Sequence, residues 1–114
     1  MDEKKYIIGN WKSNKNLLEV QSWFTEFNEL FKQGSQTSLD NLEIVICPPF
    51  LYLEKLKRFS RKMVLGAQNT FYGDVGAFTG EVSGEMLYEL GARYVILGHS
   101  ERRALGETNP EINK

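Results

Sequence analysis

Four short apolar runs alternate with helical patterns along the chain, and this alternation constrains the fold more than any other feature. The runs occupy residues 6–9, 42–47, 63–67 and 94–98. Runs that are apolar at nearly every position are typical of parallel strands buried on both faces, and the helical segments between them supply the crossovers that parallel strands need. We therefore predict an α/β protein of about four parallel strand-helix units.

The first helix is predicted from apolar side chains spaced three and four residues apart, which places them on one face. Asn14 or Asn16 can cap its start, and Gly34 can end it. Such a stripe is more often core than cofactor site, so we interpret it as core. Its members are Val20, Trp23, Phe24, Phe27, Leu30 and Phe31.

Three further helices are predicted between and after the remaining strands. Pro48 and Pro49 end the second strand because proline cannot donate to a sheet ladder. A second helix then runs to about residue 60, and a polar connector at 35–40 precedes the second strand. A short third helix covers about 83–90. Ser100 is the predicted N-cap of a fourth helix, which begins near residue 101.

Composition narrows the function classes. The 114 residues suffice for one domain with a modest core, and the formal net charge of −1 disfavours a nucleic-acid partner. No run approaches the ~20 apolar residues of a membrane span, and the charged N-terminus lacks the apolar region of a signal peptide. The single cysteine, Cys47, excludes an internal disulfide and is interpreted as a buried small hydrophobe. We expect a cytoplasmic protein without a metal site, since no Cys/His cluster has zinc spacing.

Polar side chains follow three of the predicted strands, where functional groups of parallel α/β folds collect. We expect them to share one end of the sheet. They are Asn10, Lys12, Gln68, Asn69, His99 and Glu101.

His99 is the only histidine, and a lone histidine is usually structural. Here it directly precedes a helix start, where unpaired N–H groups carry partial positive charge and disfavour the imidazolium. A neutral imidazole can still donate one N–H to a carbonyl oxygen. Lys12 is either a solvent lysine or a cation for a phosphate, and Asn10 can donate an amide N–H to the same ligand. Together these residues predict a pocket for a phosphorylated carbonyl compound.

The arginines Arg102 and Arg103 are either charges on a solvated helix face or partners in ion pairs that hold the His99 loop. Glu81 and Glu107 are the candidate partners. The loop at 69–80 lacks the glycine spacing of nucleotide-binding turns. Its aromatic residues, expected to be exposed, suggest burial against another subunit. They are Phe71, Tyr72 and Phe78.

Five segments, in this order, resemble the motifs of the triosephosphate isomerase family. They read GNWK at 9–12, VICPP at 45–49, GAQN at 66–69, GAFTGE at 76–81 and VILGHSERR at 95–103. The resemblance implies a (β/α)8 TIM barrel, of which residues 1–114 form the N-terminal part of a single domain, with the second half absent. It also implies cofactor-free interconversion of dihydroxyacetone phosphate and glyceraldehyde 3-phosphate, in glycolysis and gluconeogenesis.

The resemblance assigns roles by motif. Asn10 and Lys12 bind substrate, His99 is the neutral electrophile on the carbonyl, and Glu101 contributes to the site. Thr79 belongs to a loop that reaches the partner's active site, so a homodimer through the loop from Asn69 to Glu81 is implied, with Glu81 and Arg102 in support. The carboxylate base, the lid loop and the glycine-rich phosphate loops of the family lie in its second half, so we expect this chain alone to be inactive.

Two alternatives stay open at this point. One is a half barrel that pairs with a second half or with itself, and the other is a doubly wound phosphate-ligand module without catalysis. The segment at 104–107 is one residue shorter than in many family members, which leaves the Glu107–Arg102 pairing as an open question.

Overall fold

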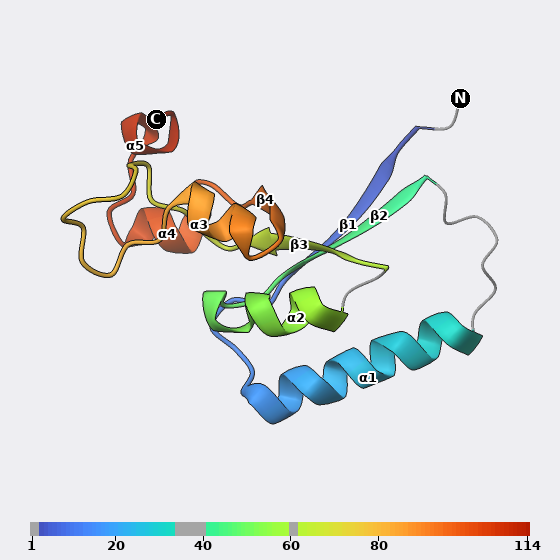
Figure 1. The fold of residues 1–114 in the computed structure, drawn as a ribbon. Coiled ribbons are helices and arrows are strands. Elements are labelled where there is room, and N and C mark those ends of the chain that lie inside the picture. Colours follow the sequence, from blue (N-terminus) through green and yellow to red (C-terminus); the bar gives the residue numbers. More distant parts are fainter. Residues whose placement is uncertain (1–2, 34–40, 60–61) are drawn as a thin grey trace.

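A computed structural model describes residues 3–33, 41–59 and 62–114 of the chain (Figure 1). Strands and helices alternate from β1 to α4, and a last short helix, α5, follows. The strands are β1 (Lys5–Asn10), β2 (Leu42–Cys47), β3 (Val64–Ala67) and β4 (Ala92–Val95). The helices are α1 (Leu17–Gln33), the 3-10 turn η1 (Phe50–Tyr52), α2 (Leu53–Phe59), α3 (Gly84–Glu89), α4 (Ser100–Ala104) and α5 (Asn109–Ile112).

The four strands form one parallel sheet in the order β1-β2-β3-β4. A doubly wound sheet reverses its strand order partway and carries helices on both faces. Here the order never reverses, and α1 and α2 lie on the same side of the strands (Figure 1). The structure therefore has the architecture of the N-terminal half of a (β/α)8 barrel, as predicted, and the sheet order does not fit the doubly wound alternative.

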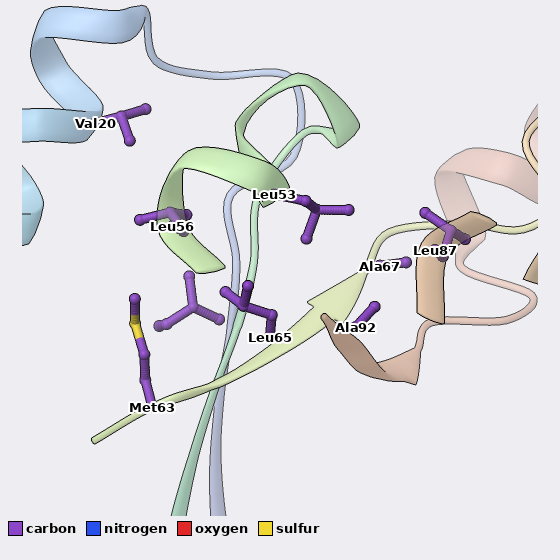
Figure 2. Close-up of a cluster of buried hydrophobic side chains, with 9 residues drawn as sticks. Val20, Leu53, Leu56, Met63, Leu65, Ala67, Leu87 and Ala92 are labelled. Atoms are coloured by element: carbon purple, nitrogen blue, oxygen red, sulfur yellow. The ribbon is translucent and has the colours of Figure 1, made fainter. Parts of the chain in front are cut away.

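The core lies between the helices and one face of the sheet (Figure 2). Alternate strand residues point toward the helices because successive side chains of a strand face opposite sides. The helices contribute their apolar stripes to the same layer. The buried members are Ile46, Leu65, Ala67 and Ala92 from the strands, Val20, Leu53, Leu56 and Leu87 from the helices, and Met63 just before β3.

The stripe predicted for α1 is core at most of its positions but not at all. Val20 is fully buried, and Trp23, Phe24 and Phe27 pack against the core. Leu30, by contrast, is 67% exposed, so its prediction as a core residue was wrong. At 3.6 residues per turn, Leu30 lies about 80° around the helix from Val20, at the margin of the stripe.

On the opposite face of the sheet, side chains of the two outer strands meet. Three strand spacings of about 4.8 Å would separate β1 from β4 in a flat sheet. The rings of Tyr6 on β1 and Tyr94 on β4 are nevertheless only 6.1 Å apart, and the Tyr94 hydroxyl donates to Glu43 on β2. Cys47 is buried, as predicted, and a Cβ at Gly66 would lie 2.6 Å from its Sγ. Glycine at 66 therefore permits the close approach of β2 and β3.

Several boundaries differ from the predictions. The second strand has the predicted bounds, but the fourth covers 92–95 rather than 94–98. The N–H of Ile96 donates to the carbonyl of Ala67, the last residue of β3, so the chain beyond it has no strand partner. Asn16 caps α1, exchanging hydrogen bonds with Glu19. Gly34, the connector at 35–40 and residue 60 lie outside the described residues. No helix in the described ranges is long and apolar enough to cross a bilayer.

Candidate functional site

A cavity of about 370 Å³ lies at the carboxyl end of the sheet. The residues that line it lie at or after the ends of all four strands, with Pro49 and Phe50 following β2, so side chains far apart in the sequence meet where the parallel strands end. Every polar residue named from the strand ends in the sequence contributes to the wall. They are Asn10, Lys12, Gln68, Asn69, His99 and Glu101.

Lys12 adopts a left-handed backbone conformation, with φ of 55°. A non-glycine residue held there costs roughly 1–2 kcal/mol, so the surrounding contacts must enforce it. The Lys12 N–H donates to Asn10 Oδ1 at 2.9 Å, and its carbonyl accepts from Gln68 Nε2 at 2.7 Å. Hydrogen bonds thus fix the backbone of Lys12 on both sides, and the residue lines the cavity at the carboxyl end of the sheet.

Gln68 is a residue whose role sequence reasoning missed. Its half-buried amide donates to the carbonyls of both Lys12 and Cys47, at 2.7 and 2.9 Å. The Cys47 carbonyl also accepts from the Trp11 N–H at 3.0 Å. One side chain from the end of β3 therefore joins the loop after β1 to the end of β2. A polar amide directly after a buried strand was the available signal, but only the geometry reveals its two acceptors.

Lys12 reaches Glu101 at the start of α4, with Nζ 2.7 Å from Oε1. The ammonium donates to the carboxylate and holds the pKa of Glu101 below its ordinary value. Both side chains are more than half exposed, so the pair contributes little to stability. Its consequence is positional, because it places a cation and an anion side by side at the cavity.

His99 is the N-cap of α4, a role predicted for Ser100. Its Nδ1 accepts from the backbone N–H of Glu101 at 3.0 Å, closer than the 3.8 Å to the Glu101 carboxylate. An accepting Nδ1 carries no proton, so the neutral ring keeps its proton on Nε2. Ser100 as N-cap would accept from the N–H of Arg102 or Arg103, but both of these donate to the carbonyl of His99, at 2.8 and 3.0 Å, so the cap lies one residue earlier than predicted.

Arg102 forms an ion pair that holds the loop around His99, as one of the two interpretations predicted, whereas Arg103 contacts this loop through a hydrogen bond. Glu107 accepts from the Gly98 N–H at 2.9 Å and pairs with Arg102 at 3.5 Å. Arg103 donates to the Gly98 carbonyl at 2.8 Å. The open question of the Glu107–Arg102 pair is thereby answered, since the shorter segment still brings the two together. Within the described part of the chain, Glu81 forms no ion pair with either arginine.

Beyond Asn69, the loop after β3 does not line this cavity. Phe71 packs against Tyr72 and Phe78, with ring centroids 4.5 and 4.7 Å apart, and the latter two are each 47% exposed. Thr79 is exposed as well, and Glu81 lines a separate cavity of about 360 Å³ near Arg102. Neither Thr79 nor Glu81 lines the cavity that contains His99.

No group of three or more His, Cys, Asp or Glu residues suited to a metal ion occurs among the residues that the structure describes.

Comparison with known proteins finds one family. The family model described as triosephosphate isomerase matches residues 5–114. Similar relatives are the triosephosphate isomerases of Dictyoglomus turgidum, 46% identical, and Alkaliphilus metalliredigens, 43% identical; each alignment covers 97% of this chain and 44% of the relative. That of Mesomycoplasma hyopneumoniae (strain 232) is 41% identical over 95% of this chain and 45% of its own length. The chain therefore spans a little under half the length of these curated relatives.

Proposed function

The chain belongs to the triosephosphate isomerase family, and we propose that its cavity at the sheet's carboxyl end binds a triose phosphate. In the complete fold of the family this site would interconvert dihydroxyacetone phosphate and glyceraldehyde 3-phosphate without a cofactor. The observation that carries the proposal is the convergence of Lys12, Asn10 and His99 on one cavity. A cation, an amide and a neutral imidazole are the groups that a phosphorylated carbonyl compound needs.

Each of these side chains has a free group for the ligand. Asn10 uses Oδ1 to hold the Lys12 backbone, which leaves its Nδ2 to donate. The Lys12 ammonium can bridge Glu101 and the phosphate, and it can stabilise negative charge that develops on the substrate oxygen. His99 engages the helix through Nδ1, so Nε2–H remains to polarise the substrate carbonyl as an electrophile.

Proton abstraction beside the carbonyl needs a base, and here the described residues offer a poor one. Glu101 is the only carboxylate that lines the cavity in this part of the chain. Its pKa is lowered by the Lys12 ammonium, which weakens it as a base. We therefore propose that residues 1–114 bind substrate without turnover, and that the base, lid and remaining phosphate loops come from the second half of the family's domain.

The loop from Asn69 to Glu81 is the proposed homodimer contact of the complete protein, with Thr79 reaching toward the partner's site. Its support is the cluster of half-exposed rings around Phe71. A cytoplasmic location is proposed as well, in keeping with the single buried thiol of Cys47.

The test is ligand binding and turnover measured on the same sample. Dihydroxyacetone phosphate titrated into ¹⁵N-labelled chain is expected to shift the resonances of Lys12 and His99, with no glyceraldehyde 3-phosphate formed in a coupled assay. Lys12→Ala and His99→Asn should each weaken binding at least tenfold, whereas Lys55→Ala, which removes a lysine of α2 distant from the cavity, should not. Binding that survives both site substitutions would contradict the site. Turnover by the isolated chain would contradict the missing base.

A further inference from the structure

Within the described residues, the two non-glycine residues with positive φ both lie in the loop between β1 and α1, at 11–16. Lys12 has φ of 55° and Lys15 has φ of 80°. In this left-handed region Cβ crowds the following carbonyl, so a residue stays there only when surrounding contacts hold it. Asn10 and Gln68 hold the backbone of Lys12. Lys15 needs a contact of its own.

Tyr52 supplies this contact from the η1 turn. Its hydroxyl donates to the Lys15 carbonyl at 2.8 Å in a partly buried setting, and its ring packs against the hydrophobic core. The Tyr52 N–H donates to the Pro49 carbonyl at 3.0 Å. Pro48, just before this turn, is fully buried, and a proline ring fixes its own φ. Tyr52 is therefore attached to a rigid turn and can hold the loop against the core.

The backbones of Lys12 and Lys15 are coupled because they lie three positions apart between two fixed points. On one side the Trp11 N–H donates to the end of β2 at 3.0 Å, and on the other α1 is anchored in the core through Val20. Asn14, between the lysines, donates to the Trp11 carbonyl at 2.8 Å and tightens the loop. If residue 15 left the left-handed region, the rest of the loop would have to adjust, and Lys12, which is already strained, would relax.

We propose that Tyr52 is a positioning residue for Lys12: by holding Lys15 left-handed, its hydroxyl keeps the loop in the conformation that presents the Lys12 ammonium at the cavity. In that conformation Lys12 Nζ lies 2.7 Å from Glu101 Oε1. Tyr52 itself does not line the cavity, so it acts through the loop. Its effect on ligand affinity rests on the proposed function, whereas its effect on the Lys12–Glu101 pair does not.

Tyr52→Phe tests the contact, because it keeps the ring in the core and removes only the hydroxyl. The Lys12 ammonium holds the pKa of Glu101 below its ordinary value, so this pKa, followed through the carboxyl carbon resonance, reports the position of Lys12. Tyr52→Phe should raise it about half as far as Lys12→Ala does, and should weaken binding of dihydroxyacetone phosphate by about threefold or more. Tyr88→Phe, at an exposed tyrosine of α3, should change neither quantity.

Lys15→Gly gives a readout that a general loss of stability would not. Glycine adopts positive φ without strain, so the loop no longer needs the hydroxyl. This substitution also removes the ammonium 5.1 Å from the Trp11 ring, so Lys15→Gly alone is the reference. Adding Lys15→Gly to Tyr52→Phe should return the Glu101 pKa and the affinity to the values of this reference, and circular dichroism verifies that each variant is folded.

Two results would overturn the role of Tyr52. One is a Tyr52→Phe chain in which the pKa of Glu101 equals that of the wild type. The other is a raised pKa that Lys15→Gly does not restore. If the wild-type chain binds no dihydroxyacetone phosphate while the pKa of Glu101 moves and is restored as expected, the proposed function fails and the role of Tyr52 is supported.

Discussion

The backbone N–H of Glu101 donates to Nδ1 of His99 at 3.0 Å, so the side chain that would polarise the substrate also caps the helix that follows it. The cap and the electrophile use different ring nitrogens. A protonated ring would lose the cap acceptor, because both nitrogens of an imidazolium are donors. Of the two neutral tautomers, the cap therefore selects the one with the proton on Nε2.

Substitution of His99 separates the cap from the electrophile. His99→Asn retains an N-cap side chain and should change the free energy of unfolding by less than about 0.5 kcal/mol, whereas His99→Ala should cost about 1 kcal/mol. Both should lose ligand binding. Urea unfolding measures the first effect, and ¹⁵N chemical shifts of the wild-type imidazole check the Nε2–H tautomer. Equal stability of the two variants would show that the cap contributes nothing.

Glu107 does not line the cavity that contains His99, but we expect it to contribute to the free energy of unfolding. Its side chain is 14% exposed, and it satisfies the Gly98 N–H as well as Arg102. Glu107→Ala leaves a half-buried N–H without its acceptor and should cost about 1–3 kcal/mol in chemical unfolding. Glu85→Ala, at an exposed position on α3, is the control and should change stability by less than about 0.5 kcal/mol. A Glu107 variant as stable as this control would contradict the role.

Much of the fold follows from the sequence because strand parity and helix spacing are local properties. The second strand was predicted at its observed bounds, and Asn16 was one of two predicted caps for α1. The bounds of the fourth strand were not predicted correctly, because residues 96–98 are as apolar as a strand. Its end depends on β3 stopping at Ala67, a property of the neighbouring strand rather than of the segment itself.

The site, like the fold, has parts that the sequence predicts and parts that it does not. His99, Lys12 and Asn10 could be named from their places after strands, and the motifs supplied their roles. The contacts that fix their geometry could not, because they join residues distant in sequence. Gln68 meets Lys12 from another strand, and the left-handed conformation of Lys12 has no signature in its own side chain.

Replacement of Gln68 tests this fixation. Gln68→Glu puts a carboxylate against the carbonyls of Lys12 and Cys47, which are both acceptors, so two hydrogen bonds become repulsive contacts. The variant should be less stable by about 1–3 kcal/mol at neutral pH. Protonation restores one donor, so this penalty should shrink as the pH falls. Thermal unfolding of both proteins between pH 4 and 8 measures the difference, and a penalty that does not change with pH would contradict the contact.

The Lys12–Glu101 pair gives a pH dependence on the acid side. The folded pKa of Glu101 lies below the ordinary 4.5, so its contribution to stability is present above that value and is lost as the pH falls through the folded pKa. The effect should be small, because both side chains are more than half exposed. Glu101→Gln should flatten that part of the stability profile, and 1 M salt should weaken the wild-type effect. An unchanged acid slope in Glu101→Gln would show that the pair is not the cause.

Tyr94 should make the folded chain less stable as the pH rises into the alkaline range. Its hydrogen bond to Glu43 raises the pKa of its hydroxyl from 10.0 to about 12, because ionisation would place two negative charges in contact. The neutral phenol is favoured in the folded chain, so its contribution is complete below pH 10 and is lost as the pH rises toward 12. Tyr94→Phe should remove this alkaline loss of stability, and Glu43→Gln should return the hydroxyl toward its ordinary pKa. Absorbance of tyrosinate, compared between wild type and Tyr94→Phe, isolates the titration of this one residue. If the difference titrates near pH 10 in the wild type, the contact between Tyr94 on β4 and Glu43 on β2 does not persist in solution.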